Sequence, residues 1–245
     1  MGRKPTEEEK KEEMSKVLVI GDTHFPAVHP GYLRFVEDLA ERYDCNKFVH
    51  IGDVVDFHAI SRFGKLPEAD GALSELDAAM LEIVKWYKQF PNLLITEGNH
   101  DQRGYRAAAE QGLPSRFIQG YNQLFGTLKW KWVKDVVIDG VYYFHGTGVS
   151  GQHPAYNTMQ KMLMSTVMGH VHTAGGIKWR ANPEKRIFGM DVGCGVDDKH
   201  LSFHYAENLK VRSILSAGVV IDGVPAHVIM PAGEGERYHR SRFKK

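Results

Sequence analysis

The residues of this chain that can do chemistry are gathered in five short segments, each with Asp, Asn or His beside a glycine. Every segment follows an apolar run of the kind that forms a buried strand. They are Gly21-Asp22-Thr23-His24, Gly52-Asp53-Val54-Val55-Asp56, Gly98-Asn99-His100-Asp101, His145-Gly146 and Gly169-His170-Val171-His172. Because α/β proteins bind ligands beyond the carboxyl ends of their strands, we expect the segments to converge on one crevice.

The donor atoms of these segments suit a metal centre. Carboxylate, imidazole and amide oxygen form a borderline ligand set, which favours Mn, Fe, Zn, Co or Ni over Ca. In extended backbone, residues i and i+2 point the same way, so Asp22 with His24, and His170 with His172, are each expected to face one site. The glycines permit tight loops and a close approach of the backbone to the ions.

A structural role is the alternative for each motif taken alone. In a chain with 13 histidines, a single Asp-x-His or His-x-His pair often decorates a surface or braces a loop. Five such motifs in order, each after a strand-like run, favour a metal centre over that role.

Strand-like and helix-like runs alternate in the first half of the chain. Residues 17–20, 48–51 and 93–95 predict buried strands, and apolar residues recur at helical spacing over 32–43 and 73–90. This alternation predicts a largely parallel or mixed sheet with helices packed on it.

The second half of the chain predicts antiparallel strands after two short helices within 103–125. Its shorter apolar runs lie at 133–138, 141–144, 167–168, 186–190 and 212–221. Asp139-Gly140 and Asp222-Gly223 predict hairpin turns, because Asp-Gly between apolar runs is a strong hairpin signal. We therefore expect two sheets packed together with helices outside.

Composition indicates a folded protein without a strong overall field. The chain has 31 Lys+Arg and 30 Asp+Glu, a net charge of +1, so long-range attraction to nucleic acid or anionic lipid is excluded. Cys45 and Cys194 form no CxxC pair, which argues against a disulfide framework or a zinc knuckle. The N-terminus lacks the apolar core of a signal peptide, and no apolar run approaches the roughly 20 residues of a membrane span. We expect a cytoplasmic protein with no membrane contact.

We divide the chain into a charged arm over 1–15, one domain over 16–232 and a basic tail over 233–245. The arm is rich in Glu and Lys with almost no apolar partner. The tail interleaves Arg and Lys with aromatic residues, a pattern that can touch phosphates and stack bases. Simple solvation of both ends is the alternative.

Taken together, DTH, GDVVD, GNHD, a later isolated histidine and GHVH resemble the signature of the calcineurin-like metallophosphoesterase superfamily. The resemblance covers roughly residues 16–192, from the outermost predicted strands. It implies an α/β (α+β) fold, a four-layer αββα sandwich of two mixed β-sheets flanked by helices. It also implies two divalent metal ions, with manganese expected first and Fe, Zn, Ni, Co or Mg as alternatives. The implied ligands are Asp22, His24 and His172 for one metal, Asn99, His145 and His170 for the other, and Asp53 as the bridge.

The implied mechanism is attack on phosphorus by a metal-bridging hydroxide. Two cations about 3.5 to 4 Å apart can share a water, acidify it and clamp phosphoryl oxygens. By the resemblance, His100 does not ligate; protonated, it stabilises the phosphoryl charge or gives a proton to the leaving oxygen. Asp56 would orient His100, as in similar phosphatases. No Ser or Cys nucleophile is required.

One departure from the family pattern concerns the arginine that clamps phosphate. Protein Ser/Thr phosphatases read GDxVDRG, whereas Asp56 is followed here by Phe57 and His58. Arg62 or Arg103 is a candidate for the missing clamp, with an ordinary surface role as the alternative. Protein phosphatase activity is disfavoured, while His100 of the GNH motif keeps monoester hydrolysis open.

The segment 146–161 lies between two ligand motifs and is expected to line the pocket, with a helix starting near Pro154. His153 and Asn157 are candidates for contact with a substrate phosphate, against a plain capping and packing role. Cys194 is expected to be a small buried residue and not a catalyst.

We therefore predict a metal-dependent phosphoric ester hydrolase, with phosphodiesters or small phosphorylated metabolites ahead of phosphoproteins. A metal-dependent nuclease is the enzymatic alternative, but near-neutral charge and the lack of a DNA-binding domain argue against it. A non-catalytic scaffold on the same fold is the other alternative, against which every expected ligand type is present. The natural substrate, the metal pair and the oligomeric state stay open.

Overall fold

A computed structural model describes residues 15–61, 71–197, 200 and 212–231 of the chain. Nearly all of the predicted arm, the whole basic tail and Arg62 therefore lie outside the described residues. Within the described part, no helix is long and apolar enough to cross a membrane.

The first sheet has six strands in the order β11-β10-β1-β2-β3-β4. Strands β1 to β4 are parallel, while β10 pairs antiparallel with both β1 and β11, so the sheet is mixed. The strands are β1 (Lys16–Ile20), β2 (Lys47–His50), β3 (Leu94–Thr96), β4 (Lys131–Val133), β10 (Ser216–Ile221) and β11 (Val224–Ile229).

The second sheet has five strands in the order β5-β6-β7-β9-β8. Strands β6, β7 and β9 are parallel, and β5 and β8 join the two edges antiparallel. The strands are β5 (Asp135–Ile138), β6 (Val141–Phe144), β7 (Ser165–Met168), β8 (Gly175–Ala181) and β9 (Arg186–Val192).

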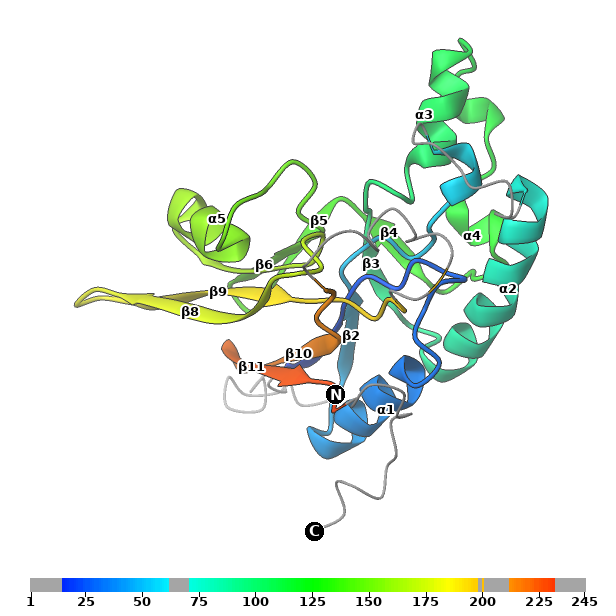
Figure 1. Ribbon diagram of the computed structural model, residues 1–245. Helices are drawn as coiled ribbons and strands as arrows, with labels where there is room; N and C mark the ends of the chain where they lie inside the picture. The colour runs from blue at the N-terminus through cyan, green and yellow to red at the C-terminus, as the bar shows by residue number, and fades with distance from the viewer. Residues whose placement is uncertain (1–14, 62–70, 198–199, 201–211, 232–245) are drawn as a thin grey trace, which may run out of the picture.

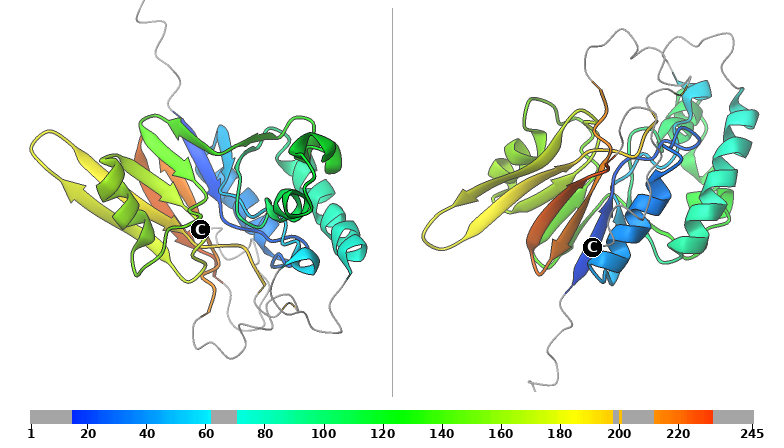
Figure 2. Two further views of the ribbon diagram at one scale, coloured as in Figure 1. Left: turned by 90° about the horizontal axis from the view of Figure 1, so that it is seen from above. Right: turned by 60° about the horizontal axis from the view of Figure 1, so that its bottom comes forward.

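Helices cover the outer faces of both sheets, which gives the predicted four-layer αββα sandwich. Figure 1 shows α1 and α2 on the side of the first sheet and α5 on the side of the second, and the turned views in Figure 2 keep that arrangement. The fold class predicted from the sequence is confirmed. The helices are α1 (Tyr32–Arg42), α2 (Ala72–Gln89), α3 (Arg103–Glu110), α4 (Tyr121–Leu124) and α5 (Pro154–Met162), with 3-10 turns at His58–Ile60 and Ser115–Phe117.

The continuous apolar run of β1 reflects its position between two cores. Leu18 and Ile20 belong to the core between the first sheet and its helices, whereas Val17 and Val19 belong to the core between the two sheets. Successive side chains of a strand point to opposite faces, so a strand buried on both sides needs apolar residues at every position.

Both predicted Asp-Gly hairpins are present. Asp139 and Gly140 join β5 to β6, and Asp222 and Gly223 join β10 to β11. All four residues have positive φ, between 48° and 75°, as a two-residue type I′ turn requires. Glycine and aspartate adopt this region more readily than bulky residues.

Two strand predictions need correction. The run 133–138, expected as one strand, is divided at Lys134, so that β4 ends in the first sheet and β5 begins the second. Strand β8 was not expected, because most of its residues are exposed and its sequence lacks an apolar alternation. It is held instead by backbone pairing with β9 along its whole length.

Candidate metal centre

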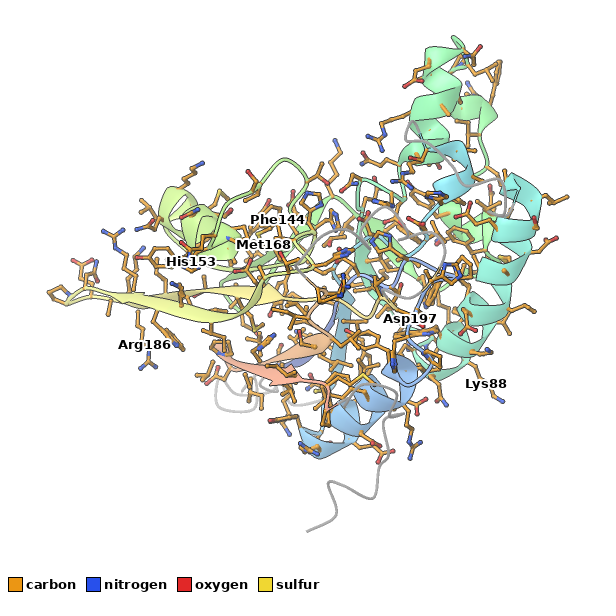
Figure 3. The ribbon with its side chains drawn as sticks, viewed as in Figure 1. Lys88, Phe144, His153, Met168, Arg186 and Asp197 are labelled. Carbon is orange, nitrogen blue, oxygen red and sulfur yellow. The ribbon has the colours of Figure 1, made fainter. Side chains whose placement is uncertain are left out.

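The chemistry-bearing segments meet at one edge of the sandwich. Asp22, Asp53 and Asn99 lie just beyond β1, β2 and β3 of the first sheet, and His145 and His170 lie just beyond β6 and β7 of the second. Figure 3 labels Phe144 and Met168, the last residues of the paired strands β6 and β7, which lie next to each other. Parallel strands thus deliver all five segments to the same crevice, as the sequence predicts.

The first donor cluster contains Asp22, His24 and His172, whose ligand atoms lie within 4.8 Å of one another. Nε2 of His172 is 3.1 Å from Oδ2 of Asp22. Asp22 is fully buried, and its Oδ1 has no hydrogen-bond partner among the described residues. A buried carboxylate oxygen without a partner is costly in a folded protein, so this atom fits a cation ligand.

The second donor cluster contains Asp53, His145 and His170, with Asn99 beside it. Nε2 of His145 lies 3.1 Å from Oδ1 of Asn99 and 3.2 Å from Nδ1 of His170. Oxygen and nitrogen donors therefore converge on a common point, as they do around a borderline metal.

Asp53 lies between the two clusters. Its Oδ2 is 3.5 Å from Nε2 of His24 in the first cluster and 3.2 Å from Nε2 of His145 in the second. One carboxylate oxygen is therefore close to donor atoms of both clusters.

Hydrogen bonds fix the orientation of two of the imidazoles. Nδ1 of His145 is 2.9 Å from the carbonyl oxygen of Ile51, and donation to that carbonyl leaves the Nε2 lone pair facing the cluster. Nδ1 of His24 likewise lies 3.1 Å from Oδ1 of Asp56, which leaves Nε2 facing Asp53. Such outer hydrogen bonds are the usual way in which a metal-ligating histidine is held in the correct tautomer.

Asp56 also holds His100, which belongs to neither of the two clusters above but forms a third group of possible donors with His24 and Asp56. Nδ1 of His100 is 2.7 Å from Oδ1 of Asp56, so this one oxygen accepts from both His24 and His100. Arg103 donates from Nη1 to the Asp56 carbonyl over 2.7 Å, and its Nη2 lies 3.2 Å from Nε2 of His100. The pairing of Asp56 with His100 predicted from the resemblance is present in the structure.

The buried carboxylates of the site favour positive charge beside them. Burial alone would raise the pKa of Asp53, but His145, His100 and His24 together hold that pKa well below its usual range. Burial would lower the pKa of His145, yet Asp53 and Asp22 raise it to about 10. In the absence of metal, two buried carboxylates thus favour a protonated His145. A divalent cation would place more positive charge beside these carboxylates than that proton does.

Three of the proposed ligands have backbone in the left-handed region. His24, Asp53 and His170 have φ of 46°, 48° and 67°, a region that residues other than glycine adopt infrequently. The expectation that extended backbone presents these pairs is therefore wrong. Left-handed turns aim His24 and His170 instead, and His170 and His172 contribute to different clusters.

The comparisons with known proteins place the chain in a family. Residues 15–196 match the model described as calcineurin-like phosphoesterase, which is well over half of the 245 residues. The chain belongs to the calcineurin-like phosphoesterase family.

Three solved structures that are similar to this calcineurin-like phosphoesterase share little sequence with it. Zinc-bound Vps29 from Entamoeba histolytica is 12% identical, with a TM-score of 0.44 and coverage of 89% of this chain and 94% of that one. The nuclease MPE from Pseudomonas putida is 16% identical, with a TM-score of 0.41 and coverage of 86% and 87%. A metallophosphoesterase from Sphaerobacter thermophilus is 15% identical, with a TM-score of 0.41 and coverage of 89% and 88%. No curated protein matches.

Two glycines of the family motifs leave space for the carboxylates of the proposed ligands. A Cβ on Gly98 would lie 2.1 Å from Oδ1 of Asp53, and one on Gly169 would lie 2.2 Å from Oδ1 of Asp22. Any side chain at these positions would displace a proposed ligand.

We expect Gly169→Ala to weaken metal binding by about 10- to 100-fold, the effect typical of disturbing the support of a metal ligand. The added methyl meets Oδ1 of Asp22 and Cγ2 of Ile51, two fully buried side chains, so the ligand itself must shift. Calorimetric titration of the metal-free protein with Mn²⁺ measures the affinity. Gly71→Ala is the matched control, because its Cβ would come no closer than 3.7 Å to Ser74 Oγ; equal affinities in the two variants would contradict this account.

Two supporting residues escaped the sequence analysis. Asp101 accepts hydrogen bonds from the amides of Val54, Val55 and Gly98, and so joins the loops that carry Asp53 and Asn99. Burial and the nearby Asp53 raise the pKa of Asp101 to about 7. Its position as the last residue of the GNHD motif could have indicated this supporting role.

His50 is the second supporting residue. The amide of Gly52 donates to its Nδ1, so Nε2 carries the proton and donates to Oγ1 of Thr23, 3.1 Å away. Thr23 in turn donates to the carbonyl of Val54. This chain of hydrogen bonds ties the loop after β1 to the loop after β2, and it requires a neutral imidazole.

We expect acid to destabilise the metal-free protein partly through His50. Burial lowers the pKa of His50 from 6.5 to about 3, so between these values the unfolded state binds more protons than the folded state. Stability is therefore retained above pH 6.5 and lost as the pH falls toward 3, with a slope of up to about 1.4 kcal/mol per pH unit for one such group. Urea unfolding between pH 4 and 7 should show a shallower slope in His50→Gln than in the wild type. Parallel slopes would rule out this role.

The remaining candidates have mixed outcomes. Arg103 contacts the site through Asp56 and His100. Cys194 is fully buried, as expected. Helix α5 does begin at Pro154, and Nε2 of His153 lies 2.8 Å from Nζ of Lys178 on β8. Contact of His153 or Asn157 with a substrate phosphate stays a prediction.

Proposed function

We propose that this member of the calcineurin-like phosphoesterase family is a two-metal hydrolase of phosphate esters. The observation that carries the proposal is the position of Asp53, with one oxygen within 3.5 Å of donor nitrogens from both clusters. Asp22, His24 and His172 would hold one ion, and Asn99, His145 and His170 the other. The proposed ions are divalent, with manganese expected first. When bound, such a pair supplies a nucleophilic water of lowered pKa and positive charge for the phosphoryl oxygens.

His100 would hold the proton that the leaving oxygen needs. Burial lowers the pKa of His100, but Asp53 and Asp56 outweigh burial and raise it above its usual value. Its Nε2 is 3.9 Å from Oδ2 of Asp53, so the proton faces the place where the reacting phosphate would lie. Asp56 accepts from Nδ1 of His100 and so fixes the ring in that direction.

The surroundings of Asp56 support phosphodiesters or small phosphorylated metabolites over phosphoproteins. Phe57 occupies the place of the arginine of protein phosphatases, and it packs against the core of the first sheet. The guanidinium of Arg103 contacts Asp56 and His100 from the first turn of α3 instead. The cationic group near the reaction centre therefore comes from a different direction.

A cytoplasmic location also remains our proposal.

Hydrolysis of two p-nitrophenyl esters tests the proposed function. Chelator-stripped protein is assayed with bis-p-nitrophenyl phosphate and p-nitrophenyl phosphate after separate addition of Mn²⁺, Ni²⁺, Zn²⁺ or Mg²⁺. The proposal expects metal-dependent turnover, with the diester preferred. Turnover that survives chelation, or silence on both esters with every metal, would overturn it, and silence would favour the scaffold alternative. Cleavage of oligonucleotides in a gel assay identifies the nuclease alternative.

A further inference from the structure

A carboxylate lies on the buried face of α2, outside the proposed metal ligands. It belongs to Glu75, which is 5% exposed. The other buried residues of α2 are Ala79, Ile83 and Trp86, which are part of the core between the first sheet and its helices. Helical spacing favours an apolar residue at the position of Glu75. Because a buried carboxylate is costly unless hydrogen bonds compensate it, its contacts show what this position gains from it.

The partners of Glu75 are the first two amides of the 3-10 turn His58–Ile60. His58 donates its amide to Oε1 over 2.6 Å, and Ala59 donates its amide to Oε2 over 2.8 Å. The first amides of a helical turn have no partner within the turn, and negative charge beside them is favourable. Both carboxylate oxygens therefore hold the start of this turn against α2.

Phe57 joins the turn to Asp56. Its φ of 49° and ψ of 41° lie in the left-handed region, which is unfavourable for a bulky side chain. The amides bound by Glu75 keep the chain after Phe57 in place, and the side chain of Phe57 packs against the core. The orientation of the peptide group between Asp56 and Phe57 therefore depends on the bonds to Glu75.

The carbonyl of this peptide group contacts the proposed acid. The carbonyl oxygen of Asp56 accepts from Nη1 of Arg103 over 2.7 Å and lies 3.1 Å from Nδ1 of His100. The carboxylate of Asp56 lies 2.7 Å from the same nitrogen. Rotation of the peptide group would move the carbonyl away from both partners and loosen the ring of His100.

The turn also lines the cavity beside His100. Ile60 and the next residue, Ser61, line a cavity of about 310 Å³ together with Asn99, His100 and Arg103. A shift of the turn would therefore change the alignment of the acid and the lining of this cavity at the same time.

We propose that Glu75 is a positioning residue for the proton donor, because it holds the turn that orients Asp56 and, through Asp56, the ring of His100. The inference rests on the proposed function, in which His100 gives its proton to the leaving oxygen as the bond from phosphorus to that oxygen breaks. Glu75 acts through the backbone from Asp56 to Ala59, and it is not itself a catalytic residue.

Glu75→Gln tests the proposal, because the amide keeps the size of the side chain but has one acceptor oxygen in place of two. At saturating Mn²⁺ we expect kcat to fall by about 10- to 100-fold, since displacement of a catalytic group by about 1 Å can cost that much. Unsubstituted phenyl esters should lose more than p-nitrophenyl esters, because a poor leaving group depends more on the acid. Glu82→Gln is the matched control on the same helix, where the carboxylate pairs with Lys85, and it should keep the wild-type rates.

The His100→Ala background separates positioning from a general effect on structure. Once the acid is absent, Glu75→Gln should slow hydrolysis further by less than about threefold, whereas a loss of folded protein would slow it by the same factor in both backgrounds. Glu75→Met suits a position facing the core and lacks a carboxylate, so it should give the same pattern and replaces Glu75→Gln if that variant does not fold. Equal factors in the two backgrounds, or equal slowing of both esters, would overturn the proposal.

The proton on Nδ1 of His100 gives a readout that needs no turnover. A charge-assisted bond to a carboxylate is short and moves the proton resonance to low field, where its loss in His100→Ala identifies it. In the metal-free protein we expect the same resonance in the wild type and Glu82→Gln, and a shifted or missing one in Glu75→Gln. An unchanged resonance in Glu75→Gln would overturn the positioning role by itself. Failure of the wild type to hydrolyse either ester with any metal would instead count against the proposed function.

Discussion

Asp53→Asn will abolish metal-dependent hydrolysis, with a loss of at least about a thousandfold in kcat/KM, equivalent to about 4 kcal/mol. Asp53 is buried between the two donor clusters, with its Oδ2 within 3.5 Å of both His24 and His145. The amide removes the negative charge that two cations would share and keeps the size of the side chain. Steady-state assays with bis-p-nitrophenyl phosphate, at saturating metal, measure the loss.

The control for this variant is Asp77→Asn, on the exposed face of α2. It makes the same chemical change away from the site, and it should retain the wild-type rate. Metal analysis by mass spectrometry accompanies both variants, and Asp53→Asn should bind fewer ions per chain than Asp77→Asn. Full activity in Asp53→Asn would refute the bridging role.

His100→Ala will keep both metal ions and lose about 10²- to 10⁴-fold in kcat, the range for a missing general acid. His100 touches Asp56 and Arg103. It groups with His24 and Asp56, and not with the donors around Asp22 and Asp53 that we propose as the metal ligands. The loss should be smaller for esters with good leaving groups, since these need less protonation. Comparison of p-nitrophenyl and unsubstituted phenyl esters therefore separates a proton donor from a residue that only maintains structure.

His227→Ala serves as the control for a lost imidazole, because His227 lies on β11 at the far edge of the first sheet. It should retain wild-type turnover. A His100→Ala variant that loses metal, or that slows both esters equally, would contradict the assignment of His100 as the acid.

The sequence allowed prediction of the site wherever a motif follows a buried parallel strand. Parallel strands end at the same edge of a sheet, and this brings together the residues that follow them, namely Asp22, Asp53, Asn99, His145 and His170. The position of each motif directly after an apolar run reveals this in the sequence. The roles of these residues as ligands remain predictions. The fold followed from the same alternation of strands and helices.

Other features depend on contacts between loops and strands that the spacing of residues along the sequence does not indicate. The positive φ of His24, Asp53 and His170 is not signalled by residue type, because none of them is a glycine. The double contact of Asp56 with His24 and His100 requires knowing where three loops lie. Strand β8 is polar and exposed, and its pairing with β9 replaces the apolar signal that strand prediction needs.

The central claim is that two ions share one carboxylate, and electron paramagnetic resonance of the Mn²⁺-loaded protein tests it most directly. Metal-free protein is titrated with Mn²⁺, and the spectrum is followed together with the number of ions bound per chain. Our account predicts two ions per chain, consistent with the two donor clusters that meet at Asp53, and a spectrum of exchange-coupled manganese. One ion per chain, or two ions with the spectrum of isolated Mn²⁺, would contradict it.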